Sequence, residues 1–97
     1  MSEKRDTILV AEDSAPNRTI LVHLLKKIGF DVLECADGEI AWQELEKSKA
    51  SGISVVAIIS DIMMPKSDGI ELLKKVRADE RFKNTPFVLV TAVSDKD

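Results

Sequence analysis

Residues 53–60, ISVVAIIS, are the most continuously apolar stretch of the chain and restrict its fold more than any other segment. Strands without a polar face are covered on both sides, which is typical of the central strands of a parallel sheet. The run is followed directly by Asp61. We therefore expect a buried parallel strand with a carboxylate at its C-terminal end.

Three shorter runs also have strand character. Residues 7–11 (TILVA) are apolar and rich in β-branched side chains, residues 30–35 (FDVLEC) alternate weakly, and residues 86–91 (PFVLVT) begin at a proline, which a strand tolerates at its first position. Helical patterns separate the four runs. The order βαβαβαβ predicts one α/β domain over residues 1–97, with right-handed crossovers and a parallel sheet.

Each helical segment carries start and stop signals. Ser14 is a candidate N-cap of the first helix, and Gly29 is a candidate stop. The second helix is expected to open at Asp37, and the third at Asp68, with Glu71 in capping-box spacing. The side chains expected to face the core are Leu21, Leu24, Leu25 and Ile28 in the first helix, Ala41 and Leu45 in the second, and Leu72, Leu73 and Val76 in the third.

Composition and charge exclude several classes of protein. Hydrophobic residues make up 44% and charged residues 32% of the chain, the balance of an ordinary globular domain. The net charge of −3, without a basic stripe, argues against direct nucleic-acid binding. Apolar runs fall short of the roughly 20 residues of a membrane span, and the charged start does not resemble a signal peptide. We therefore expect a cytoplasmic protein without a membrane partner. Cys35 is the only cysteine, so an intrachain disulfide is excluded.

Three of the four predicted strands stop at polar residues: the first at Glu12 and Asp13, the third at Asp61 and the fourth at Thr91. If the first and third strands are neighbours, as in the flavodoxin-like order 2-1-3-4, the three carboxylates meet at one edge of the sheet. Like charges held so close need a cation, and an oxygen-only set suits Mg²⁺. Thr91 and the backbone N–H of Ala92 could then hold phosphoryl oxygens.

A simpler interpretation stays open for these residues. Acidic residues at strand ends are commonly solvated turn formers or helix caps, and this explains Glu12 and Asp13 as well as a metal site does. Thr91 by itself is more often a strand former than a ligand. Asp61 is harder to explain in this way, because turn chemistry does not call for the two methionines that follow it in DIMM.

Longer motifs resemble one known family. ILVAEDSAPNR resembles the opening strand and acidic pair of response-regulator receiver domains, SDIMMPKSDG their phosphoacceptor loop, VLVTA the end of their fourth strand, and ADGEIA the start of their second helix. The motifs occur in the family's order along the whole chain. The resemblance implies a three-layer αβα fold of the flavodoxin type and a role in two-component signal transduction.

The resemblance also implies a role for residues of the acidic edge. Asp61 corresponds to the phosphoacceptor and Asp13 to a direct Mg²⁺ ligand. Glu12 corresponds to a ligand that usually acts through water, and Met63 would offer its backbone carbonyl to the metal.

Two further residues match the phosphoryl-binding strand end of the family. Thr91 corresponds to the switch hydroxyl, which is drawn toward the phosphoryl group on activation, and Ala92 is small enough to leave the acceptor approachable. The implied donor is a phosphohistidine on a histidine kinase or a histidine phosphotransfer protein. Phosphoryl acceptance would be self-catalysed, so the chain is not expected to be an enzyme.

The chain departs from the family pattern at its C-terminus. Complete receivers continue through a fourth helix, a fifth strand and a fifth helix, and the lysine that pairs with the phosphoryl group lies at the end of the fifth strand. The sequence ends at Asp97, before these elements, and Lys66 is not at the matching position. We expect an incomplete receiver whose exposed fourth strand favours self-association.

Two other functions compete with phosphoryl acceptance. A Mg²⁺-dependent phosphatase with an aspartyl nucleophile would want an acid/base carboxylate two residues after Asp61, where this chain has Met63. A truncated receiver that cannot be phosphorylated would act only through protein–protein association.

Overall fold

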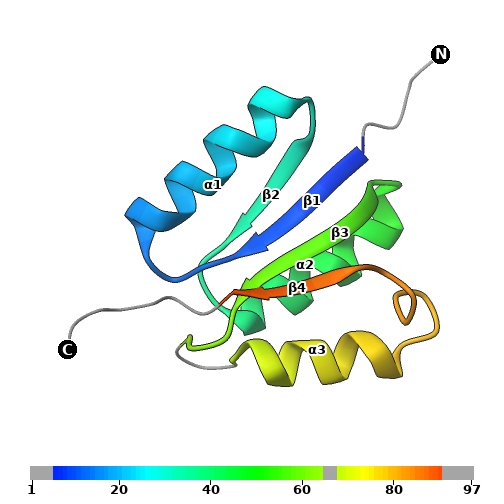
Figure 1. The fold of residues 1–97 in the computed structure, drawn as a ribbon. Coiled ribbons are helices and arrows are strands. Elements are labelled where there is room, and N and C mark those ends of the chain that lie inside the picture. The colour runs from blue at the N-terminus through cyan, green and yellow to red at the C-terminus, as the bar shows by residue number, and fades with distance from the viewer. Residues whose placement is uncertain (1–5, 65–67, 91–97) are drawn as a thin grey trace, which may run out of the picture.

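Four parallel strands form one sheet in the computed structural model, which describes residues 6–64 and 68–90. The strands lie in the order β2-β1-β3-β4, as the sequence predicted (Figure 1). Their bounds are Asp6–Ala11 for β1, Asp31–Cys35 for β2, Ser54–Asp61 for β3 and Phe87–Val90 for β4. The helices between them are α1 (Ala15–Ile28), α2 (Gly38–Ser51) and α3 (Gly69–Ala78).

Strand boundaries differ slightly from the predicted ones. β2 begins at Asp31 rather than Phe30, because the N–H of Phe30 still donates to the carbonyl of Leu25 at the end of α1, at 3.1 Å. β3 includes Asp61, which is in register with Val90 of β4. The predicted fourth strand reached Thr91, which lies outside the described residues.

Helix ends lie close to where the sequence placed them. Ser14, Asp37 and Asp68 each accept a hydrogen bond from the backbone N–H three residues later. Gly29 and Gly52 follow α1 and α2 with left-handed φ angles of 118° and 77°. Glycine adopts this conformation without a steric penalty, so both residues are effective helix stops.

The helices divide unequally between the two faces of the sheet. α2 and α3 pack on one face, and α1 lies on the other, over β1 and β2 (Figure 1). Alternate strand residues therefore point into two layers: Leu9 belongs to the core beneath α2 and α3, while Val10 points toward α1. The main core cluster consists of Leu9, Ala11, Cys35, Ala41, Leu45, Ile58, Leu72, Val76 and Phe82.

The sequence predicted correctly only two of the four side chains of α1 that were expected to face the core. Leu21 and Leu25 are partly buried, but Leu24 is 51% and Ile28 is 70% exposed, and the buried residue of the helix is Val22. Because α1 packs mainly on β1 and β2, only a narrow arc of the helix is covered. The prediction that Leu24 and Ile28 are core residues was wrong.

The burial of Leu72 and the exposure of Ile70 predict that substitutions at these two positions of α3 differ in their effect on stability. Leu72→Ala should lower the free energy of unfolding by about 2–5 kcal/mol, because it leaves a cavity beneath the helix. Ile70→Ala, at an exposed position of the same helix, should cost about 1 kcal/mol or less. Urea denaturation followed by Trp42 fluorescence measures both, and equal losses would contradict the assignment.

Candidate functional site

Three carboxylates converge where β1 and β3 end. The two strands are direct neighbours with Ala11 opposite Ser60, so the next residues along each chain, Glu12 and Asp61, lie side by side. Together with Asp13, each offers a carboxylate oxygen, and these atoms all lie within 4.8 Å of one another. Glu12 and Asp61 are buried, whereas Asp13 is exposed. The structure thus brings together the three acidic residues that the sequence singled out.

The loop after β1 is fixed by hydrogen bonds around Glu12. The backbone N–H of Glu12 donates to the carbonyl of Cys35 at the end of β2, at 3.0 Å. The N–H of Ser14 donates to Oε2 of Glu12 at 3.1 Å, which orients the carboxylate. Nη1 of Arg18 donates to the backbone carbonyl of Glu12 at 2.7 Å, and its Nε lies 3.7 Å from Oε1 of Glu34 on β2. Arg18 therefore ties α1 to the ends of both strands.

The segment around Asp61 is held from both sides. The N–H of Ile62 donates to the carbonyl of Val90 at 3.1 Å, which continues the pairing between β3 and β4. The N–H of Met63 approaches Oδ1 of Asp61 at 3.4 Å, and Oγ of Ser60 donates to the carbonyl of Asp61 at 2.9 Å. The first and third of these contacts fix the backbone around Asp61, and the contact from Met63 restricts the orientation of its side chain.

Crowding of like charges shapes the electrostatics of the cluster. Burial raises the pKa of Glu12 above its ordinary value, and the carboxylates of Asp61 and Asp13 raise it further, while the hydrogen bond from Ser14 acts in the opposite direction. The cluster consequently resists full ionisation in the absence of a cation. A divalent ion at this point would remove that penalty.

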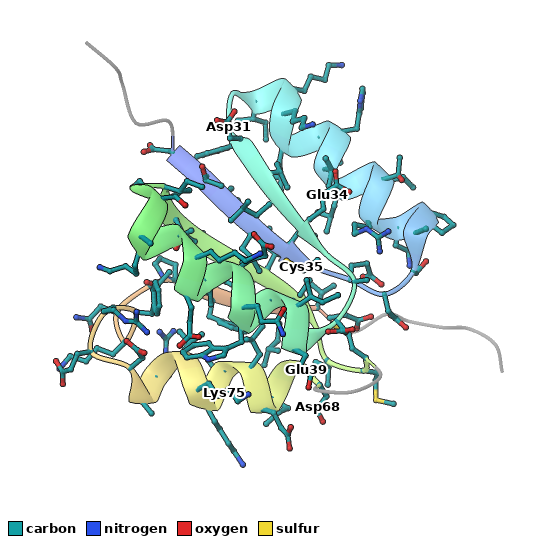
Figure 2. The ribbon with its side chains drawn as sticks, turned by 180° about the vertical axis from the view of Figure 1, so that it is seen from behind. Asp31, Glu34, Cys35, Glu39, Asp68 and Lys75 are labelled. Atoms are coloured by element: carbon teal, nitrogen blue, oxygen red, sulfur yellow. The ribbon has the colours of Figure 1, made fainter. Side chains whose placement is uncertain are left out.

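A surface hollow opens beside the cluster. It is lined by Asp13, Met63, Met64 and Asp68. Figure 2 shows Asp68 at the start of α3, where its side chain also caps the helix. Of the three clustered carboxylates, Asp13 lines this hollow.

Two contributions to the site, those of Arg18 and Asp68, were not predicted from the sequence. Arg18 escaped notice because an arginine in a helix gives no signal that it reaches a backbone carbonyl six residues earlier. Asp68 was recognised as a cap, but its place on the rim of the hollow depends on the fold. Thr91 and Ala92, and with them Lys66, lie outside the described residues, so their roles stay predictions.

Gly69 fits closely against the strand that carries Asp61. A Cβ at this position would overlap the backbone carbonyl of Asp61 and come within 2.9 Å of a Leu89 methyl group and 3.0 Å of Oγ of Ser60. The N–H of Gly69 also donates to the carbonyl of Ile62 at 2.9 Å. The absence of a side chain thus lets α3 begin directly beside the carboxylate site.

Comparison with known proteins assigns the family. The sequence profile of the response regulator receiver domain matches residues 8–97. The chain belongs to the receiver family. This receiver is 38% identical over 90 residues to chemotaxis protein CheY1 of Helicobacter pylori strain J99, with 92% of the chain and 69% of that protein covered. It is also 38% identical over 90 residues to a CheY homologue of Campylobacter jejuni, of which it covers 66%.

Solved structures agree with this assignment. Chemotaxis protein CheY4 of Vibrio cholerae has a TM-score of 0.78 and 32% identity, with 95% of this receiver and 72% of that chain covered. The receiver domain of sensor histidine kinase PA1611 from Pseudomonas aeruginosa has a TM-score of 0.81 and 28% identity, with 97% and 72% covered. That structure holds a magnesium ion coordinated in its active site cleft. The chain is thus a CheY-like receiver domain of two-component signalling.

The described part of this receiver was also searched for membrane-spanning segments. None of its helices has the length and apolarity that a bilayer crossing requires.

Substitution of Gly69 tests the close approach of α3 to the acidic strand. Gly69→Ala should lower the free energy of unfolding by about 1–3 kcal/mol, because the added methyl group pushes α3 away from β3. Thermal unfolding followed by circular dichroism measures the loss. An unchanged melting temperature would show that the contact is looser than the structure indicates.

Substitution of Glu12 tests the repulsion within the cluster. Because the folded-state pKa of Glu12 is raised, its ionisation penalises the native state as pH rises above 4.5 and through that folded pKa. Without divalent ions at pH 8, Glu12→Gln should therefore stabilise the protein by on the order of 1 kcal/mol. The gain should vanish at acid pH, where the wild-type carboxyl is protonated.

A matched control separates this effect from net charge. Glu80→Gln removes one negative charge from an exposed side chain near Lys83, and no gain in stability is expected from it. Melting temperatures of the three proteins between pH 4 and pH 8 measure the difference. Equal behaviour of the two variants would argue against repulsion within the cluster.

Proposed function

We propose that Asp61 accepts a phosphoryl group from a phosphohistidine of a histidine kinase or phosphotransfer protein, with Mg²⁺ held at the same site. The observation that carries the proposal is the convergence of Glu12, Asp13 and Asp61, whose oxygens lie within 4.8 Å of one another. Membership of the receiver family and the magnesium ion in the PA1611 receiver support it.

The donor set of the site fits Mg²⁺. Its side chains offer only oxygen atoms, the hard ligands that this ion prefers, and three carboxylates leave coordination positions for water and a phosphoryl oxygen. Burial and the neighbouring carboxylates of Asp61 and Asp13 raise the pKa of Glu12, and a cation at the same point would offset this repulsion. We propose Glu12, Asp13 and Asp61 as side-chain ligands, with the backbone carbonyl of Met63 as a fourth. When bound, the ion would neutralise charge that develops on the transferred group.

The residues of the chain itself account for the transfer step. A carboxylate oxygen of Asp61 attacks phosphorus, the P–N bond of the donor breaks, and the released imidazole keeps the electron pair and takes up a proton. The N–H of Met63, 3.4 Å from Oδ1, helps to hold the attacking carboxylate in one orientation. Asp61 is buried, and we propose that the donor approaches it from the hollow that the neighbouring Asp13 and Met63 line. Thr91 and Ala92 are proposed to hold the oxygens of the transferred group.

We propose that the chain accepts one phosphoryl group and does not turn over substrate as a phosphatase would. The phosphoryl group stays on the protein, so the chain is a self-catalysed acceptor and not an enzyme. A phosphatase with an aspartyl nucleophile would want an acid/base carboxylate two residues after that nucleophile, but this position is Met63, whose side chain is apolar. We therefore propose that the reaction of Asp61 ends at the aspartyl phosphate.

Intact-mass spectrometry tests the proposal directly. Incubation of the chain with Mg²⁺ and phosphoramidate, a small P–N phosphodonor, should add one phosphoryl group, and chelation of the metal should abolish the addition. Asp61→Asn should lose the adduct completely. Asp6→Asn is the matched control, because this aspartate lies at the opposite end of β1.

The outcomes separate the candidate functions. An adduct that persists in Asp61→Asn would place the acceptor elsewhere. A folded wild-type chain without any adduct would overturn phosphoryl acceptance and favour a receiver that acts only through protein association.

A further inference from the structure

Arg18 is a charged residue of α1 that takes no part in the proposed transfer step, although its side chain is only 22% exposed. Its backbone N–H donates to the carbonyl of Ser14 at 2.9 Å, the first hydrogen bond of the helix. Because helical side chains tilt toward the N-terminus of their helix, an arginine at this position reaches back over the preceding loop. That loop carries Glu12 and Asp13.

The guanidinium of Arg18 holds one peptide group of this loop. Nη1 donates to the carbonyl oxygen of Glu12 at 2.7 Å. The carbonyl belongs to the planar peptide group that joins Glu12 to Asp13, so the hydrogen bond fixes the orientation of the whole group. The next peptide group, which joins Asp13 to Ser14, is held by the bond from the N–H of Ser14 to Oε2 of Glu12, at 3.1 Å. Asp13 thus lies between two hydrogen-bonded peptide groups.

A carboxylate of β2 faces the same guanidinium. Glu34 lies on β2 beside α1 (Figure 2), and its Oε1 is 3.7 Å from Nε of Arg18. An arginine serves a carbonyl and a carboxylate together because its donors form a rigid fork. The pair carries no net charge, so Arg18 holds the loop without placing an unbalanced positive charge beside the carboxylate cluster.

We propose that Arg18 positions Glu12 and Asp13 to bind Mg²⁺, an inference that rests on the proposed function. By fixing the backbone of the loop, it keeps both carboxylates in the arrangement in which their oxygens lie within 4.8 Å of that of Asp61. Arg18 is not among the side chains that line the hollow beside the cluster. It therefore acts through the loop and is a positioning residue, without contact with the transferred group.

Two roles of Arg18 predict opposite changes in metal affinity. If Arg18 acted only through its charge, its removal would leave the site more negative and would tighten Mg²⁺ binding. If it positions the loop, its removal weakens binding, because loss of a group that orients metal ligands typically costs about 10–100-fold in affinity. A role in stability alone would lower the melting temperature and leave the affinity of the folded chain unchanged.

Mg²⁺ titration followed by amide chemical shifts in NMR spectra measures the sign of this change. Arg18→Met should bind Mg²⁺ about tenfold more weakly or worse, at a temperature where circular dichroism shows the folded state. Lys26→Met is the matched control: it removes a positive charge from α1 about two turns further along the helix, and its affinity should stay within about twofold of wild type.

A second variant tests the contribution of the carboxylate partner. Glu34→Ala, at a half-exposed position, should weaken Mg²⁺ binding by a smaller factor than Arg18→Met, because it removes only the group that steadies the guanidinium. In the Arg18→Met background it should have no further effect, since interacting residues are not additive. Additive losses in the double variant would show that Glu34 acts through its charge and not through Arg18.

Amide hydrogen exchange of the metal-free protein gives a readout that does not depend on Mg²⁺. Exchange of the Ser14 N–H should be faster in Arg18→Met, because its acceptor on Glu12 is no longer held in place. The amide of Leu9, in the buried centre of β1, is the internal reference and should change only as much as the global stability does.

The outcomes separate this inference from the proposed function. A wild-type chain that binds Mg²⁺ and gains the phosphoryl adduct, with an Arg18→Met variant that binds Mg²⁺ equally or more tightly, would overturn the positioning role and leave the proposed function intact. A wild-type chain that binds no Mg²⁺ would overturn the proposed function. In either case, Ser14 exchange that stays as slow in Arg18→Met as in wild type would contradict a role of Arg18 in fixing the loop.

Discussion

The parallel pairing of β1 with β3 is the constraint on which the rest of the structure depends. These strands are separated in sequence by two helices and by β2, yet Ala11 and Ser60 lie opposite each other. This pairing places Glu12 beside Asp61 and makes both strands central, which explains why neither has a polar face. The same hydrogen bonds that build the sheet thus assemble a charged site from segments that are distant in sequence.

This arrangement brings buried carboxylates close enough to repel one another, and local hydrogen bonds hold them in place despite that repulsion. The sheet forces carboxylates together at a buried position, and the raised pKa of Glu12 is the result. Backbone hydrogen bonds from Ser14 and Met63 orient two of the carboxylates, while Arg18 binds the carbonyl of Glu12. The chain thus orients the carboxylates without neutralising their mutual repulsion, which a bound cation would offset.

Sequence reasoning predicted the features that depend on local pattern and on topology. The strand order, the caps at Ser14 and Asp68 and the meeting of the three carboxylates follow from apolar runs and their connections, and the structure confirms them. Periodicity marks Leu24 as apolar but does not say how far the sheet extends beneath its helix, so its burial was predicted wrongly. The reach of Arg18 depends on three-dimensional placement that no local pattern encodes.

The anchoring of α1 has a consequence for signalling. The helix begins directly after the acidic loop, and its Arg18 binds the carbonyl of Glu12 and lies 3.7 Å from Glu34 of β2. A displacement of the acidic loop on occupation of the carboxylates would therefore reach α1 and β2 through one side chain. Because energetic coupling between two sites is reciprocal, a partner bound to α1 in the displaced position would strengthen binding at the carboxylates by the same factor.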